Sequence, residues 1–389
     1  MQAGAESAAS EASVKFEISK SRMVLAAVIR SWLGRILVLS LLLGGCPNLG
    51  TARTRKTAAA ATAEVVKIAN FGELAKCLAV VEGDEGAGSG FLLHYKGNAL
   101  LFTNAHVVSG NPHIRAWLLG GKELNLDKFA VAKVFKHSVA QGFDVAVFSQ
   151  NGCPDGMDYE TNVEQAAQPG DDVIVLGNSE GQGVVTPIAG KLTGIGPDLI
   201  ETDAKFVSGN SGSPIILVKT GKVIGIATFS RYTEYKTFGK DSKFNAVERR
   251  FGCRVDTIPG WEFPPIERFN AESETVKSMT SRTDNMAAMV TGIYTRGRLG
   301  LDPHLREDDP LAKSVHNYLS DLTAPRHSKE DSADIKDRFI RELLFENHAD
   351  INSLNLSLFT EYHRRKLEEQ MDTRELIRRA MVQIQNIQD

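Results

Sequence analysis

Short apolar runs, separated by glycine, proline or charged residues, follow one another along the middle of this 389-residue chain. Each is three to five residues long, which suits a β-strand and is too short for an ordinary helix. Many short strands with turn residues between them predict an all-β sandwich or barrel. The runs are residues 78–81, 90–93, 99–102, 131–135, 145–148, 172–176, 184–187, 190–193, 199–201, 213–217 and 223–227.

A histidine, an aspartate and a serine stand beside three of these runs. One run leads into His106, another follows Asp144 and a third follows Ser211. A serine hydroxyl is too weakly acidic to attack a carbonyl unaided, so a neutral imidazole must take its proton and a buried carboxylate must orient the imidazole. Each residue alone has a structural interpretation, as a core histidine, a strand-end carboxylate or a turn serine. Their order and common setting favour a catalytic triad.

The turn around the serine reads Ser208-Gly209-Asn210-Ser211-Gly212-Ser213-Pro214. Gly209 tolerates a backbone conformation that a side chain disfavours. The N–H groups of Gly209 and Ser211 can then point at the oxyanion of a tetrahedral intermediate. We therefore expect the oxyanion hole in the stretch Gly209, Asn210 and Ser211.

With its neighbouring motifs, the chain resembles the trypsin-like serine protease superfamily, and within it the bacterial HtrA (Deg) branch. The matching strings are Gly88-Ser89-Gly90-Phe91, Thr103-Asn104-Ala105-His106-Val107-Val108, Asp144-Val145-Ala146-Val147, Val175-Leu176-Gly177-Asn178-Ser179, Glu201-Thr202-Asp203-Ala204 and Gly209-Asn210-Ser211-Gly212. The resemblance covers residues 65 to 232 and implies two β-barrels with the active site in the cleft between them. The runs up to residue 148 would build the first barrel, and the later runs the second.

The chain also departs from the relatives that it resembles. Ser213 stands where the HtrA branch usually has a second glycine, and no PDZ domain is recognisable downstream. Gating by peptides bound to a PDZ domain and assembly into cages are therefore not expected. Asn210 replaces the aspartate that pairs with a newly cut N-terminus in digestive relatives, so activation by N-terminal cleavage is not expected either.

The resemblance further implies which residues meet the substrate. The strand with Ile226, Ala227 and Thr228 would line the primary specificity pocket and pair with the substrate backbone. These side chains are small or apolar, and Lys205 is cationic where a preference for basic residues would require a carboxylate. We expect a small or medium aliphatic residue before the cleaved bond. In the alternative, Lys205 points to solvent and has no bearing on specificity.

A leader precedes the strands. From Met23 the chain carries two arginines, then the apolar run 36–43, then small residues before Cys46. This is the pattern of a secretory signal peptide, and the run is short for a membrane span. The string Leu43-Gly44-Gly45-Cys46 resembles a bacterial lipobox, in which Cys46 becomes the lipidated N-terminus. A core helix or an uncleaved anchor is the alternative, and residues 1–22 lack an apolar face, which suggests Met23 as the true start.

The charge and the cysteine spacing of the chain limit which partners and cofactors are expected. The formal net charge of −3 and the sequence pI near 6.3 give no reason to expect a polyanion, so nucleic acid is not an expected partner. The spacings of Cys77, Cys153 and Cys253 match no zinc motif, and neither a metal nor a cofactor is expected. If Cys46 is lipidated, the other three cysteines allow one disulfide at most, and we expect Cys77 to be a buried thiol.

The pattern changes after residue 232. Two stretches place apolar residues at the helical period: Ile335, Phe339, Ile340, Leu343 and Leu344, then Leu376, Ile377, Ala380, Met381 and Ile384. The basic run His363-Arg364-Arg365-Lys366 is typical of a solvated helix face. Amphipathic helices need a cover, so the C-terminal helices could also join copies of the chain. The expected organisation is a leader at 1–46, a flexible tether at 47–64, a protease domain at 65–235, a linker at 236–269 and an α-helical domain at 270–389.

These observations predict an exported serine endopeptidase, with an all-β double β-barrel domain followed by a small α-helical C-terminal domain. Ser211 would form an acyl-enzyme with protein or peptide substrates in the periplasm or cell envelope, for protein quality control or processing, with a lipid at Cys46 attaching the chain to the membrane. A chain ending near residue 268 would keep this activity. Two alternatives stay open: a pseudoprotease that binds peptides without cutting them, and a structural envelope lipoprotein that acts through its helical tail.

Overall fold

The computed structural model describes residues 71–84, 86–137, 143–150, 155–235, 245–296 and 353–386. The expected leader and tether, with Cys46, lie outside the described residues, as do Cys153 and the apolar face at 335–344. The chain divides into two compact units. One comprises Cys46–Thr275 with Phe359–Arg365, and the other comprises Met1–Gly45, Val276–Leu358 and Lys366–Asp389.

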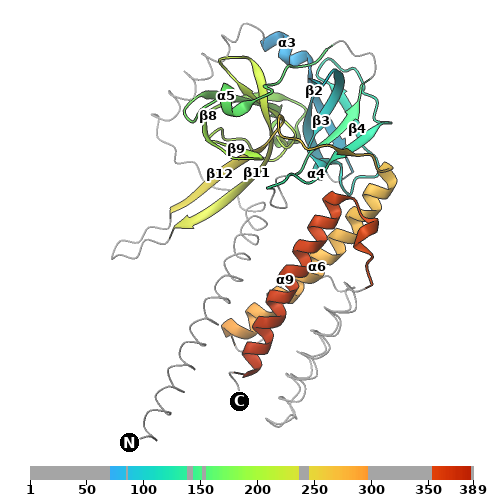
Figure 1. Cartoon of the computed structure of the whole chain (residues 1–389), viewed down its shortest axis with the longest axis vertical. Coiled ribbons are helices and arrows are strands. Elements are labelled where there is room, and N and C mark those ends of the chain that lie inside the picture. Colours follow the sequence, from blue (N-terminus) through green and yellow to red (C-terminus); the bar gives the residue numbers. More distant parts are fainter. Residues whose placement is uncertain are drawn as a thin grey trace, which may run out of the picture. The chain divides into compact units, whose positions relative to one another are not determined.

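The first barrel is built from a seven-stranded antiparallel sheet in the order β13-β5-β6-β3-β2-β1-β4. Figure 1 labels β2, β3 and β4 of this sheet. Its elements are α3 (Phe71–Lys76), β1 (Leu78–Gly83), β2 (Gly86–Tyr95), β3 (Asn98–Thr103), α4 (Ala105–Val108), β4 (Arg115–Leu118), β5 (Phe129–Ala132), β6 (Ala146–Ser149) and β13 (Trp261–Glu262). Phe91 and Phe102 pair across β2 and β3, and their buried rings stack with centroids 5.7 Å apart. This packing fixes β3, the strand that leads into His106.

The second barrel is closed, in the order β10-β11-β12-β9-β8-β7. Its elements are α5 (Val163–Ala166), β7 (Asp172–Asn178), η2 (Ser179–Gly181), β8 (Val185–Ile195), β9 (Leu199–Thr202), β10 (Pro214–Leu217), β11 (Lys222–Tyr235) and β12 (Asn245–Arg254). Fully buried Val175, Ile215 and Ile224 belong to the apolar cluster that fills it. The two barrels confirm the predicted fold class.

The stretch 236–269, expected as a linker, differs from that expectation. It contributes β12, which pairs with both β9 and β11 and so closes the second barrel, and β13, which pairs with β5 of the first. The reason is visible in its sequence: β12 carries Glu248, Arg249 and Arg250 in succession, so it shows no apolar run. Backbone pairing, which needs no apolar side chain, makes this segment a strand.

The C-terminal part is helical, as predicted. It contains α6 (Ile266–Arg296), η3 (Leu356–Leu358) and α9 (Glu361–Asn386). Within the unit that holds most of both helices, the buried guanidinium of Arg374 donates to Thr283 Oγ1 at 2.8 Å and to Met279 O at 3.3 Å. Of the apolar face predicted on the last helix, Ile377 is fully buried but Leu376 is 42% exposed.

No helix in the described ranges has the length and apolar character needed to cross a membrane.

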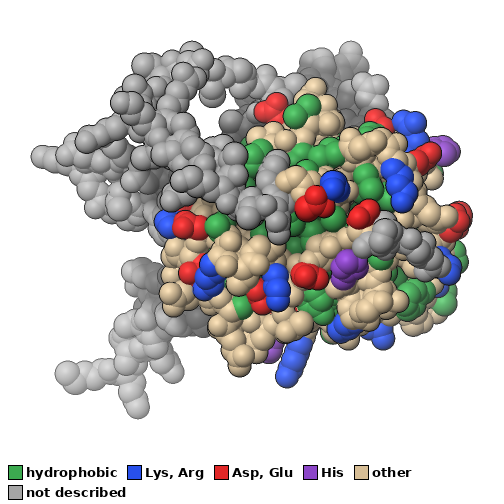
Figure 2. Space-filling model, turned by 90° about the horizontal axis from the view of Figure 1, so that it is seen from above, with side chains coloured by type: hydrophobic (Ala, Val, Ile, Leu, Met, Phe, Trp, Pro, Cys, Tyr) green, Lys and Arg blue, Asp and Glu red, His purple; other side chains and the backbone are tan. Residues whose placement is uncertain are grey.

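The surface carries charges of both signs. Figure 2 shows acidic and basic side chains interspersed among apolar ones over one face of the molecule. Several form exposed ion pairs, such as Lys191 with Asp172 at 2.7 Å. Exposed pairs of this kind contribute little to stability, so the described barrels depend mainly on their buried apolar clusters.

Candidate active site

His106 and Asp144 meet where β3 pairs with β6. Thr103 of β3 lies opposite Ala146 of β6, so the residues that follow β3 and those that precede β6 lie at the same end of the sheet. His106 follows β3 on the short helix α4, and Asp144 precedes β6. Two residues that lie 38 positions apart in the chain are thereby brought into contact.

The Asp144 carboxylate holds His106 with both oxygens. Oδ1 accepts the backbone N–H of His106 at 2.8 Å, and Oδ2 pairs with Nδ1 of the ring. The Asp144 side chain is 8% exposed and that of His106 is 40% exposed. A carboxylate can only accept, so Nδ1 carries a proton, and in the neutral ring Nε2 then keeps its lone pair. This is the tautomer that a general base requires.

Buried Asn104 and Thr228 connect Asp144 to the second barrel through hydrogen bonds. Asn104 Nδ2 donates to the Asp144 carbonyl at 2.6 Å and reaches Thr228 Oγ1 at 3.3 Å. Thr228 Oγ1 in turn donates to Ile226 O at 2.7 Å and accepts the N–H of Cys253 at 3.3 Å. The aspartate is therefore tied to the second barrel. Thr228 was expected at the substrate, and nothing in its sequence setting indicated this bridging contact.

Two glycines shape the turn that carries Ser211. Gly209 has φ +86° and Gly212 has φ +89°, a region that side chains disfavour. A Cβ on Gly209 would also collide with the backbone oxygen of Asn178, and one on Gly212 with that of Ser89. Both positions therefore require glycine for steric and conformational reasons.

Ser89 of β2 holds the Ser211 turn against the first barrel. Its N–H donates to Ser211 O at 2.8 Å, and its hydroxyl donates to Gly209 O at 2.7 Å. The same hydroxyl accepts the N–H of Asn178 from β7 at 2.8 Å. Ser89 is 1% exposed, so it is a buried connector between the barrels. Ser89 belongs to one of the strings that resemble the HtrA branch, but the sequence did not indicate that it connects the two barrels.

Backbone directions leave two N–H groups of the turn available. Ser208 O accepts from Glu180 N at 2.8 Å and Asn210 O from Ser213 N at 2.9 Å, so the N–H groups of the same two peptides, on Gly209 and Ser211, point the opposite way. In the described part of the chain neither has an acceptor. The Asn210 N–H donates to Val207 O at 3.0 Å, so Asn210 supports the turn instead of serving as an oxyanion donor.

Gly88 lets the serine turn and the histidine helix approach each other. A Cβ on Gly88 would lie 2.8 Å from Val107 Cγ2 and 3.1 Å from Ser211 O. Val107 is the neighbour of His106, so α4 and the Ser211 turn flank the same glycine. Ser211 itself is half-buried, and its hydroxyl has no hydrogen-bond partner among the residues that the structure describes.

The proposed specificity residues are placed differently from the expectation. The side chains of Ile226 and Ala227 are fully buried and belong to the two apolar cores, so they do not form the wall of an open pocket. Their strand continues past them, with Phe229 half-buried and Tyr232 37% exposed. Lys205 is exposed, as in the alternative that it points to solvent.

Both described cysteines are buried, as expected for Cys77. Burial raises the pKa of the Cys253 thiol to about 12, so this thiol stays neutral at physiological pH. A neutral buried thiol is a poor nucleophile. The hydroxyl of Ser211 is therefore the better candidate nucleophile at this site.

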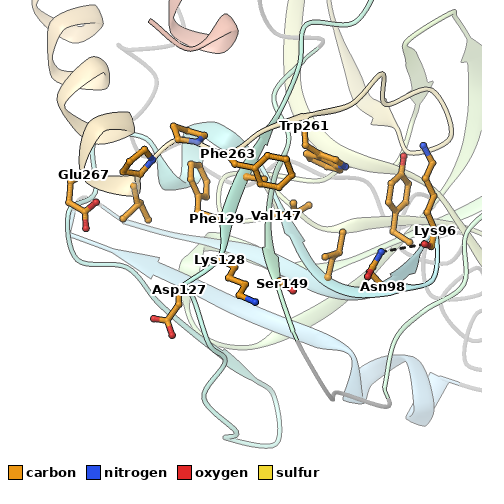
Figure 3. Close-up of a pocket in the computed structure, with 16 residues that line it drawn as sticks. Lys96, Asn98, Asp127, Lys128, Phe129, Val147, Ser149, Trp261, Phe263 and Glu267 are labelled. Carbon is orange, nitrogen blue, oxygen red and sulfur yellow. Dashed lines mark hydrogen bonds between the residues drawn. The ribbon is translucent and has the colours of Figure 1, made fainter. Parts of the chain in front are cut away.

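A separate cavity of about 830 Å³ lies on the first barrel (Figure 3). Phe129, Trp261 and Phe263 line it, with Lys128 and Glu267 also at its wall. None of the three triad candidates lines this cavity. It is therefore distinct from the site at His106.

Comparisons with known proteins agree with this geometry. Residues 88–226 match the family model described as a trypsin-like peptidase domain. The chain is 32% identical over 164 residues to the putative serine protease HhoB of Synechocystis sp.. The aligned stretch covers 38% of this chain and 35% of HhoB. It is 30% identical over 159 residues to the serine protease Do-like HtrA of Lactococcus lactis, over 36% of each. The chain thus spans about a third of the length of the curated relatives that it matches.

Solved structures include distant neighbours. One is Rv3671c from M. tuberculosis in an inactive form, 21% identical, covering 53% of this chain and 93% of that one with a TM-score of 0.35. Another is the HtrA-type protease AlgW with a tripeptide, 22% identical, covering 49% and 61% with a TM-score of 0.36. Residues 88–226 thus match the trypsin-like peptidase domain model, and part of the chain is similar in sequence to HtrA-type serine proteases.

Proposed function

We propose that this chain is a serine endopeptidase in which Ser211 is the nucleophile, His106 the general base and Asp144 the residue that orients His106. The observation that carries the proposal is the double contact of buried Asp144 with His106, which selects the neutral tautomer with its proton on Nδ1 and its lone pair on Nε2. The family match of residues 88–226 supports the same class of enzyme.

The chemistry proceeds in two halves. Ser211 Oγ attacks the peptide carbonyl while its proton passes to Nε2 of His106, and the N–H groups of Gly209 and Ser211 bind the resulting oxyanion. His106 then gives the proton to the leaving amine, and an ester to Ser211 remains. Water next loses a proton to His106 and attacks the ester. The acid product leaves as Ser211 regains its proton.

The hydroxyl of Ser211 needs a small adjustment before it can react. Without substrate, catalytic hydrogen bonds are often long or poorly aligned, and they tighten when the site is filled. The half-buried Ser211 and the neighbouring α4 flank Gly88 already, so a rotation of the Ser211 side chain is the change we propose. The alternative of a peptide-binding pseudoprotease corresponds to a site in which this adjustment never occurs.

The substrate would lie extended along β11. β10 pairs with β11 only as far as Ile226, so the next residues of β11 keep an edge without a strand among the described residues. An extended peptide can add to such an edge through backbone hydrogen bonds. A small or medium aliphatic residue before the cleaved bond remains our proposal.

Location in the cell envelope is proposed from the sequence of residues 23–46. Cleavage before Cys46 and acylation of its thiol would tether the enzyme to a membrane, where it would process or remove envelope proteins. Mass spectrometry of the membrane-extracted protein tests this. A mature chain that begins elsewhere and carries no lipid would overturn the lipid anchor.

A fluorophosphonate probe, which reacts with activated serines, tests the enzymatic proposal. The purified chain should label and cleave casein, and Ser211→Ala should do neither. Asp144→Asn should slow turnover roughly 10⁴-fold through the wrong tautomer, and His106→Ala should cost on the order of 10⁴- to 10⁶-fold.

Ser213→Ala is the matched control, since it removes a buried hydroxyl two residues from the nucleophile and should leave labelling intact. Labelling that survives Ser211→Ala would assign the nucleophile to another residue. A folded wild-type chain that binds peptide without labelling would favour the pseudoprotease.

A further inference from the structure

We propose that the first turn of α9, which lies more than 250 positions after His106 in the chain, positions the catalytic histidine through a largely buried hydrogen-bonded network, the rear clamp. The clamp consists of Ser109, Glu272, Ser273, Thr360 and His363. All five belong to the unit that holds the barrels. The inference rests on the proposed function, since it assigns positioning residues to the same site.

The clamp grips the end of the helix that carries His106. Ser109 caps α4, and its Oγ lies 2.6 Å from Ser273 Oγ on α6. The next two residues are held by Asn270 of α6: the Gly110 N–H donates to Asn270 Oδ1 at 3.1 Å, and Asn270 Nδ2 donates to Asn111 O at 3.1 Å. Three successive residues after α4 are thus fixed by α6.

His363 links α9 to the same serine. Its Nε2 lies 2.8 Å from Ser273 Oγ and 3.5 Å from Ser109 Oγ, and its Nδ1 lies 3.0 Å from Glu272 Oε2. Thr360 donates to the same carboxylate oxygen through its N–H at 3.0 Å and its hydroxyl at 2.8 Å. His363 is fully buried, so its ring is oriented by these contacts and not by solvent.

The carboxylate of Glu272 stays charged in this setting. Burial alone would raise its pKa, but hydrogen bonds from His363, Thr360 and Arg268 outweigh burial and lower the pKa to about 2. An ionised carboxylate orients the His363 ring with a charge-assisted bond. Glu272 therefore orients the ring of His363, whose other nitrogen lies 2.8 Å from Ser273 Oγ.

The same turn of α9 also packs against Phe143, the residue that precedes Asp144. Tyr362 is 1% exposed, and its ring packs against Phe143 with centroids 5.2 Å apart. Phe143 is fully buried and directly precedes Asp144. On the other side, the Tyr362 ring meets Phe269 of α6 at 5.5 Å. Both members of the His106–Asp144 pair thus have a neighbour held by the segment Phe359–Arg365.

The chemistry of the clamp indicates positioning rather than packing alone. Apolar side chains could hold two helices at lower cost, because buried polar groups are unfavourable unless every bond is made. Directional bonds fix a position instead, and a displacement of about 1 Å in a catalytic group can cost about 10²-fold in rate. The clamp is not a second active site, because Ser273 is 6% exposed and its hydroxyl also donates to Phe269 O at 2.8 Å.

The test compares Ser273→Ala and His363→Ala in the full chain with Thr275→Ala. Thr275 is the matched control: it is a half-buried residue on the same helix, and among the described residues its hydroxyl donates to the carbonyl of Ala271 in its own helix. Ser273→Ala and His363→Ala should lower kcat about 10- to 100-fold with KM unchanged, and Thr275→Ala should change neither.

A second readout follows the position of His106 without catalysis. The far-downfield NMR resonance of the His106 Nδ1 proton should shift in both clamp variants and not in Thr275→Ala. Ser109→Ala combined with Ser273→Ala should cost less than the sum of the single losses, because both act through one bond.

The proposed role of the clamp would be wrong if the Ser273→Ala and His363→Ala proteins fold, keep the wild-type kcat and show the His106 resonance at its wild-type position. If His363→Ala does not fold, the two serine variants still decide the matter. A wild-type chain that fails to react with a fluorophosphonate would overturn the proposed function instead, and the resonance would still report on the clamp.

Discussion

At the scale of single residues, Gly177 and Ser213 show how one missing side chain makes room for another. Ser213 is fully buried, and its hydroxyl has no partner among the described residues. A Cβ on Gly177 would collide with that hydroxyl. Ser213, where HtrA-type sequences usually carry glycine, is therefore accommodated because β7 has glycine opposite it.

This pairing predicts a compensating double substitution. Gly177→Ala should lower the free energy of unfolding by about 1–3 kcal/mol through overpacking, while Ser213→Gly should be tolerated. The double variant should recover part of the loss, since the first collision is gone and only the contact with Ser89 Oγ remains. Urea unfolding of the four proteins checks this, and strictly additive effects would contradict the steric explanation.

At the scale of elements, the helices α6 and α9 begin inside the barrel unit. Phe269 and Tyr362 are fully or almost fully buried, and they pack with Phe129 and Phe143 of the first barrel. Buried aromatic side chains of this size typically contribute about 3–5 kcal/mol each. The expected boundary, with a helical domain separate from the protease, therefore differs from the observed packing.

This packing revises the expectation for shortened chains. A chain ending at residue 268 loses Phe269 and Tyr362 and uncovers Phe143, so we expect it to be destabilised and to react with a fluorophosphonate far more slowly than the full chain. A chain ending at residue 365 retains both aromatic residues and His363, and should label faster than the shorter one. Equal labelling by all three chains would show that the protease is independent of its tail.

At the scale of the whole molecule, the candidate site depends on both barrels at once. The first barrel supplies His106 and Asp144, and the turn with Ser211 comes from the second. Ser89 and Asn104 of the first barrel cross to Asn178 and Thr228 of the second through hydrogen bonds. Separation of the barrels would therefore break the candidate triad before it unfolded either core.

Global stability should fall in acid because of Glu272. Its folded pKa of about 2 lies below its ordinary value of 4.5, so its contribution is complete above pH 4.5 and is lost as the pH falls toward 2. The shift corresponds to about 3 kcal/mol. Glu262, whose pKa is raised by burial, acts in the opposite direction.

Unfolding by urea between pH 5 and pH 2.5 checks this prediction. The full chain should lose stability more steeply than Glu272→Gln, which lacks the titrating group. Parallel curves for the two proteins would show that Glu272 is not coupled to folding.

The sequence alone determined the class of fold and the three triad candidates, because apolar runs and catalytic strings are local patterns of neighbouring residues. Only the tertiary structure decided which strand closes the second barrel, since β12 pairs through its backbone and carries charged side chains. The tertiary structure also decided where His363 lies. The sequence predicted a solvated helix face, but His363 is fully buried against Ser273. Contacts between residues far apart in the chain leave no local pattern, so their partners emerge only when the barrels and helices pack.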